Sequence, residues 1–159
     1  MPKDLQKGYG ILEIVLVVSI GLVIFLGVQG YLSLSLKIAI QDASENEALY
    51  LAKSSLEEAR ALRDGGWANV SALTLGNQYN FQATGADPQA IAAVAGTKTI
   101  GKYTAWIRTY SVARDINDDI VSSGGTVDAN TLKIVSSVSW QNLGTAKQVD
   151  LYEYLVNLE

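Results

Sequence analysis

The sequence predicts an α+β protein in which a long N-terminal helix packs against a small antiparallel sheet. Three observations predict it: an apolar run from Ile11 to Leu32, an amphipathic stretch after it, and three strand-like segments towards the C-terminus. A chain of 159 residues with 48% hydrophobic content suits one small domain plus one membrane helix. We expect four segments: residues 1–8, a membrane helix over 9–37, its amphipathic continuation over 38–64, and a globular head over 65–159.

The apolar run is long enough to cross a bilayer. It holds 22 residues and one charge, that of Glu13. At about 1.5 Å per residue a helix of this length spans roughly 30 Å of hydrocarbon. Lys3 and Lys7 precede the run, which favours an N-terminus kept in the cytoplasm and an exported remainder. A cleaved secretory signal is the competing interpretation, but it requires a shorter apolar core followed by a small-residue cleavage site.

Glu13 is the departure from the apolar pattern. A carboxylate at mid-bilayer costs about 2.5–3.5 kcal/mol, and less near an end, so such a residue is usually paired or functional. The alternative is structural, because Glu13 lies close to the helix start and its side chain can reach back to the interface.

The residues around Glu13 resemble a known processing signal. Lys7 and Gly8 are followed by aromatic Tyr9, three small or apolar residues, Glu13 and about twenty apolar residues. This pattern resembles the type III signal of type IV prepilins and type II secretion pseudopilins. The resemblance implies that a prepilin peptidase removes residues 1–8 by cutting after Gly8, that the new α-amino group of Tyr9 is methylated, and that Glu13 pairs with the N-terminal cation of a neighbouring subunit. Tyr9 replaces the phenylalanine that is usual in this family.

The resemblance also implies a function and a location. The chain would be a structural subunit, major or minor, of a pilus or secretion-like filament that polymerises through its apolar helix. The precursor would be a single-pass protein of the cytoplasmic membrane, in contact with lipid, with its head outside, and would later join a cell-surface or periplasmic filament. Its partners would be like or related subunits, the peptidase, and the assembly platform and ATPase. The alternative is a membrane-anchored binding module that never polymerises.

The helix is expected to continue as an amphipathic spine. Apolar residues recur at three- and four-residue spacing, at Ile40, Ala48, Leu51, Ala52, Leu56, Ala59 and Leu62. Gly65 and Gly66 follow and predict the helix end near Arg63. Together with the membrane run this makes one helix of roughly 50 residues, about 80 Å long. We expect Trp67, directly after the glycines, to anchor the core of the head.

Strand patterns fill the C-terminal part of the chain. Apolar and polar residues alternate, or β-branched and aromatic residues gather, over 102–114, 132–140 and 147–158. The connections between these segments favour antiparallel neighbours. Residues 70–75 and 79–84 are candidates for shorter strands, whereas the small residues of 83–97 predict an exposed loop.

Composition argues against an enzyme. The chain has no cysteine and no histidine, which removes thiol nucleophiles, sulfur ligands and the commonest general base. A net charge of −4 makes a nucleic-acid partner unlikely, and the nearest basic group consists of Lys98, Lys102, Arg108 and Arg114.

Calcium is the one cofactor with candidate ligands, and we expect none to be bound. Asp115, Asn117 and Asp119 stand at alternating positions, with Asp128 further on, and oxygen ligands at such spacing can hold Ca²⁺. The glycine and glutamate of an EF-hand loop are missing at the expected positions, and Asp and Asn are also ordinary turn residues.

Overall fold

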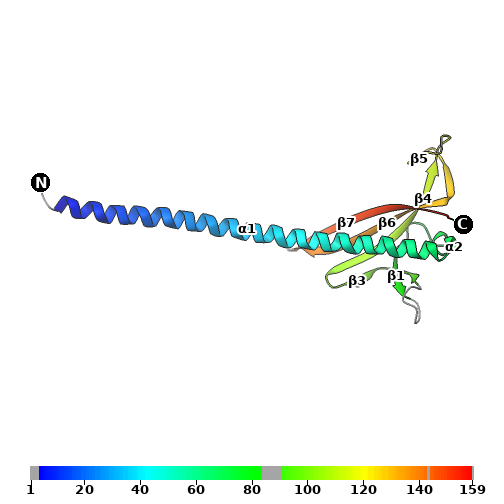
Figure 1. The fold of residues 1–159 in the computed structure, drawn as a ribbon, viewed down its shortest axis with the longest axis horizontal. Helices are drawn as coiled ribbons and strands as arrows, with labels where there is room; N and C mark the ends of the chain where they lie inside the picture. The colour runs from blue at the N-terminus through cyan, green and yellow to red at the C-terminus, as the bar shows by residue number, and fades with distance from the viewer. Residues whose placement is uncertain (1–3, 84–90, 143, 159) are drawn as a thin grey trace. The chain divides into compact units, whose positions relative to one another are not determined.

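The fold is α+β, as the sequence predicts. The structure, a computed structural model, describes residues 4–83, 91–142 and 144–158, with side chains described from Gly10 onward. Its helices are α1 (Asp4–Asp64) and α2 (Trp67–Ser71), and its strands are β1 (Tyr79–Ala83), β2 (Ile91–Ala95), β3 (Lys98–Ile100), β4 (Tyr103–Arg114), β5 (Ile120–Val121), β6 (Thr126–Asn142) and β7 (Thr145–Val156). In the head, the antiparallel sheet lies along the last third of α1 (Figure 1).

The chain divides into two compact units within the length of α1. One is Met1–Ala43 and the other is Ser44–Glu159. The second unit, which we call the head, therefore includes the last third of the helix together with the sheet. The head begins where the helix first buries residues, at Ser44 and Ala48.

Two glycines end α1, as expected. The amide of Gly65 donates to the carbonyl of Ala61 at 3.1 Å, and that of Gly66 donates to Arg63 at 2.8 Å. Gly66 has a φ of 131°, a conformation that other residues rarely adopt. The chain then turns into α2, so the strand expected over 70–75 is wrong: this segment completes a short helix and a turn, because Val70 is buried against the core.

The three long strands confirm the predicted antiparallel sheet. The strand order is β2-β1-β4-β6-β7, with β3 and β5 also paired to β4. The expected strand 79–84 is present as β1, although Thr84 lies outside the described residues. The loop expected over 83–97 is partly wrong, because Ile91–Ala95 forms β2 and pairs along the whole of β1. Small residues such as alanine do not signal a strand locally, and here the pairing partner supplies the hydrogen bonds.

One face of the sheet is covered by the helix and forms the core. Two clusters of buried side chains join α1 to the strands: Leu56, Ala59 and Leu62 pack with Phe81, Ile107, Ile134 and Leu155, and Ala48 and Ala52 pack with Tyr103, Val138 and Trp140. Trp67 packs against the first cluster, as expected. Ile40 departs from the predicted core face, since it is 59% exposed and lies in the first unit, before the sheet begins to cover the helix.

Polar contacts fix the helix to the sheet at both ends of this core. The Arg60 guanidinium donates from Nε and Nη2 to the two carboxylate oxygens of Glu153 on β7, both at 2.6 Å. Near the start of the head, the Tyr103 hydroxyl lies 2.7 Å from Glu47 Oε2 and 3.1 Å from the carbonyl of Ser44. Burial, together with the Glu47 carboxylate, raises the pKa of Tyr103 to about 12. These contacts set the position of α1 along the strands.

Candidate functional site

The apolar part of α1 carries the strongest functional signal. Over its most apolar 18-residue window the mean hydropathy is 2.9, and none of that window is buried by the rest of the chain. The helix is therefore long and apolar enough to be a candidate membrane span. Ser19, a polar residue within it, donates its hydroxyl to the carbonyl of Val15 at 2.7 Å, so the helix itself satisfies this donor.

Glu13 is the only charged residue between Ile11 and Leu36, and it lies on α1 with its side chain exposed. The Glu13 carboxylate makes no hydrogen bond or salt bridge with another residue of the described part of the chain. Gly8 and Tyr9 fall within α1 by their backbone, but their side chains lie outside the part of the chain that the structure describes. By backbone, the adjacent Gly8 and Tyr9 and, about one turn further on, Glu13 thus lie near the start of one helix.

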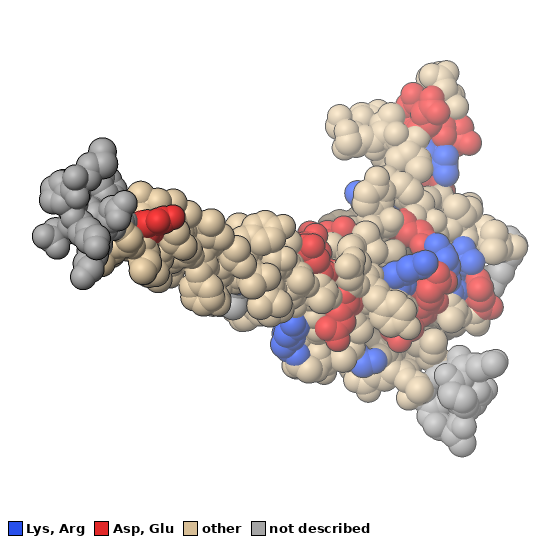
Figure 2. Space-filling view, turned by 60° about the vertical axis from the view of Figure 1, so that its left-hand side comes forward, with Lys and Arg blue, Asp and Glu red and all other residues tan. Residues whose placement is uncertain are grey.

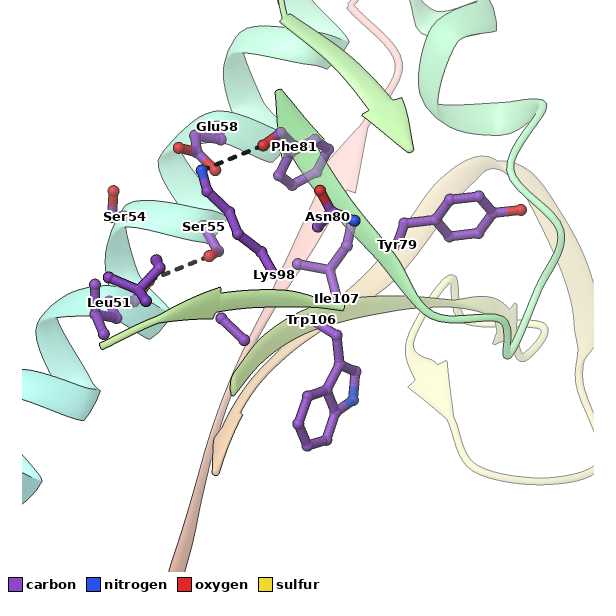
Figure 3. Close-up of a pocket in the computed structure, with 12 residues that line it drawn as sticks. Leu51, Ser54, Ser55, Glu58, Tyr79, Asn80, Phe81, Lys98, Trp106 and Ile107 are labelled. Carbon is purple, nitrogen blue, oxygen red and sulfur yellow. Dashed lines mark hydrogen bonds between the residues drawn. The ribbon is translucent and has the colours of Figure 1, made fainter. Parts of the chain in front are cut away.

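A small cavity lies between α1 and the strands β1, β3 and β4. Its volume is about 30 Å³, which leaves room for roughly one water molecule. Lys98 reaches into it and donates to the carbonyl of Phe81 at 3.4 Å, with Glu58 beside it (Figure 3). Burial raises the pKa of the Glu58 carboxyl, and the nearby Lys98 partly offsets this. The cavity is too small for an organic substrate.

The predicted calcium ligands are arranged around an arginine. Arg114 donates from Nε to Asp128 Oδ2 at 2.8 Å and from Nη1 to the backbone carbonyl of Asp118 at 2.8 Å. Asp115 Oδ1 accepts the amides of Asn117 and Asp119, at 2.9 and 3.0 Å. Within the described ranges there is no group of three or more acidic, histidine or cysteine side chains placed to hold a metal ion. Asp128 is paired with the guanidinium of Arg114, and Asp115 closes a turn, so both carboxylates already have partners in this structure.

The Asp128 cluster gives a prediction about acid stability. Hydrogen bonds from Thr131 and Arg114 lower the pKa of the Asp128 carboxyl from 3.8 to about 2. The folded head therefore holds this proton less tightly than the unfolded chain, so the carboxylate stabilises the head above about pH 4, and that stabilisation is lost as the pH falls towards 2. We expect Asp128→Asn to lower the melting temperature at pH 7 and to flatten its decline between these two pH values.

The measurement is thermal unfolding of the purified chain in detergent at a series of pH values. Asp150→Asn is the matched control, because the exposed Asp150 contacts only the amide of Gln148 among the hydrogen bonds of the described residues. A variant at Asp128 with the same acid profile as the unaltered protein would contradict the prediction.

The basic residues singled out in the sequence are dispersed. Lys98 lies in the small cavity, Lys102 donates to Ser44 Oγ at 2.7 Å, and Arg114 is paired with Asp128. Arg108 lies on the opposite sheet face from the core, with its guanidinium carbon 5.9 Å from the ring of Trp106. The structure therefore brings together no continuous basic strip from this group.

Comparison with known proteins supplies no relative. The chain matches no model of a protein family, no curated protein and no solved structure at a significant level.

Proposed function

We propose that this protein is a structural filament subunit, a pilin or pseudopilin of a type IV pilus or a type II secretion-like system. It would be cut after Gly8 and polymerise through the apolar part of α1. The observation that carries the proposal is Glu13, a single carboxylate five residues beyond the proposed cut in an otherwise apolar helix.

The apolar surface of the helix supports this proposal. Large apolar side chains from Ile11 to Leu36 are between 50% and 72% exposed, and they lie on every side of the helix. Burying such a surface is favourable by roughly 25 cal/mol for each Å² removed from water. Lipid can cover it in the precursor. In a filament, the same surface on neighbouring helices would replace the lipid, and this packing would hold the polymer together.

The proposed cut explains why a carboxylate is retained at this position. Cleavage would create a positively charged α-amine at Tyr9, on the edge of the apolar helix. Burying that cation among other helices costs several kcal/mol unless an opposite charge meets it. Glu13 of a neighbouring subunit, displaced along the filament axis, would be that charge. A single ion pair in an apolar bundle also selects one register, as buried polar residues do in coiled coils.

The proposal places the precursor in the cytoplasmic membrane with its head outside. A prepilin peptidase would remove the first eight residues and methylate Tyr9, and an assembly platform driven by an ATPase would add the subunit to the filament. The head has a core that joins α1 to the strands and an outer sheet face with exposed side chains, and both suit a building block.

The first test is the mass and N-terminal sequence of the protein from the membrane fraction, with and without the peptidase gene. We expect a chain that begins at a methylated Tyr9 only when the peptidase is present. An intact Met1 start in peptidase-competent cells would contradict the proposal and favour a membrane-anchored module that does not polymerise.

A further inference from the structure

The head has a projecting segment, residues 112–130, that we call the arm. It begins where the pairing register between β4 and β6 shifts, between Ser111 and Val112. Ser111 pairs with Leu132, but the next residue, Val112, pairs with Asp128, so three residues of β6 are skipped. It contains the end of β4, the whole of β5 and the start of β6. The arm forms the lobe at the top of Figure 2, where Figure 1 labels β5.

The arm is held in a defined shape. The Arg114 and Asp128 side chains join its two long strands, and β5 pairs with the end of β4. At the tip, the amide of Asp115 donates to the carbonyl of Asp119 at 3.0 Å, which closes a tight turn. Gly125 passes so close to Arg114 that an added Cβ would lie 2.5 Å from the arginine carbonyl oxygen. These contacts leave the arm little conformational freedom to lose when it binds a partner.

Apolar side chains on this ordered arm are exposed. Ile116 at its tip is 99% exposed, Val127 is 64% exposed and Ile120 is 44% exposed. Asp118 and Asp119 follow Ile116 by two and three residues, and Figure 2 shows acidic side chains gathered on this lobe. An ordered tip of this composition can contact a partner through an apolar side chain and through charged groups beside it, as interfaces combine the two.

The outer face of the sheet has the complementary chemistry. On β4, β6 and β7 the residues Tyr110, Lys133 and Tyr154 are in register, in a row on the face away from the helix. Lys133 Nζ lies 4.5 Å from the ring centre of Tyr152, and Figure 3 shows Trp106 pointing away from the core side of β4. Aromatic residues and arginine are the types that most often anchor protein interfaces, and Arg108 lies on this same face.

A groove marks where an apolar side chain would enter this face. It has a volume of about 500 Å³, with Lys133 and Tyr154 on one side and Ile120 and Val121 of the arm on the other. Among the described residues, neither Lys133 nor Arg108 has a salt-bridge partner. The groove therefore combines the apolar Ile120 and Val121 with a lysine that stacks on Tyr152 but has no salt-bridge partner among the described residues. Such a groove can receive the isoleucine of the arm tip and a carboxylate beside it.

We propose that the arm of one head docks against the Lys133–Tyr154 groove of a second copy of this chain. Ile116 would enter the groove, and the carboxylate of Asp119, three residues further on, would face Lys133. Because the two surfaces are different patches of the same head, the contact is heterologous, and contacts of this kind extend into open helical polymers. The inference rests on the proposed filament, for which it names the head-to-head contact.

The contact is small, and this sets when it forms. One loop in one groove covers much less than the roughly 800 Å² per partner of a standard stable interface. It would be weak between free heads and would form when the apolar helices bring the heads to a high effective concentration. The arm would then set which neighbouring head lies beside each groove.

Cysteine cross-linking of the full-length chain tests the contact, because the chain has no cysteine of its own. Ile116→Cys and Tyr154→Cys are made in separate chains and expressed together in cells that make filaments, which are then treated with a short bis-maleimide. We expect a cross-linked dimer that contains one chain of each kind. Ile116→Cys paired with Tyr50→Cys, on the exposed side of α1, is the matched control and should give little dimer.

Charge exchange provides a second readout with the same cysteine pair. Asp119→Lys alone and Lys133→Glu alone should each lower the yield of dimer several-fold, and the two together should restore it. Restoration would also show that the altered heads are folded. A yield that the exchange leaves unchanged, or one equal to that of the Tyr50 control, would overturn the proposed contact.

The outcomes separate this inference from the proposed function. If the chain is cut after Gly8 and forms filaments but the mixed dimer is missing, the arm contact is wrong and the filament proposal stands. If the mixed dimer forms in the membrane although the chain is neither cut nor polymerised, the contact stands and the filament proposal fails. Cross-linking of the Ile116→Cys chain to a different protein alone would overturn the assignment of a second copy as partner.

Discussion

Replacing Glu13 by leucine is expected to leave the chain in the membrane and to reduce filament yield by at least about tenfold. Removing one partner of a buried ion pair typically costs 3–5 kcal/mol, because the other charge stays buried alone, and 1.4 kcal/mol already corresponds to a factor of ten. Insertion of the precursor, by contrast, should be as good as before or better, since a carboxylate in the apolar run costs up to about 2.5–3.5 kcal/mol.

This opposite response of insertion and assembly distinguishes the two candidate functions. The measurement is the amount of protein in the membrane fraction and in sheared extracellular or periplasmic filaments. Glu13→Asp, which keeps the charge, should retain part of the assembly, and Ser19→Leu, in the same helix, should have little effect. Normal filament yield from the Glu13→Leu chain would remove the main support for the proposed function, whereas loss of both fractions would point to a structural role in insertion.

Replacing Ile134 by alanine is expected to destabilise the head by about 3–4 kcal/mol, a typical cost for removing a large buried side chain and leaving a cavity. Ile134 is fully buried on β6 and lies between Thr109 of β4 and Glu153 of β7 in the register of the sheet. Its side chain belongs to the cluster that joins the helix to the strands. The free energy of unfolding of a small domain is about 5–15 kcal/mol in total, so the substitution should remove a large part of the stability of the head.

Urea unfolding of the full-length chain in detergent would measure this change. All three tryptophans, Trp67, Trp106 and Trp140, lie in the head, so their fluorescence follows the head and not the apolar helix. Ile116→Ala is the control of the same type at a 99% exposed site, and it should change the free energy of unfolding by no more than about 0.5 kcal/mol. Equal effects of the two substitutions would show that Ile134 does not lie in a packed core.

Much of the fold follows from periodicities that a single segment carries. The apolar run, the three- and four-residue spacing of Leu56, Ala59 and Leu62, and the glycines at 65 and 66 define α1 before any tertiary contact is known. The alternation over the three long strands predicts β4, β6 and β7 to within a few residues for the same reason. The pattern around Glu13 is likewise local, because the Lys-Gly pair, the single charge and the apolar length all belong to one continuous segment.

The predictions from sequence that were wrong concern segments whose structure depends on contacts with another segment of the chain. Ile91–Ala95 has a weak strand signal and becomes β2 because β1 pairs with it, and residues 70–75 lose their apparent strand pattern because Val70 turns towards the core. Asp128 could be judged a metal ligand from its spacing, and only the fold shows that Arg114, 14 residues away, takes its carboxylate.

The sequence by itself therefore determined the long helix, its apolar and amphipathic parts, the main strands and the residues of the proposed cleavage and pairing signal. Each of these is a pattern of residues that are close together in the sequence. Only the tertiary structure decided which face of the sheet the helix covers, and hence that Lys133 and Tyr154 share an exposed face while Ile134 is buried. It also decided that residues 112–130 project as an arm with Ile116 at the tip. The physical reason is that the exposure of a side chain and its charge pairing depend on contacts between segments far apart in the chain. The local periodicity of a strand does not predict which other segments it will contact.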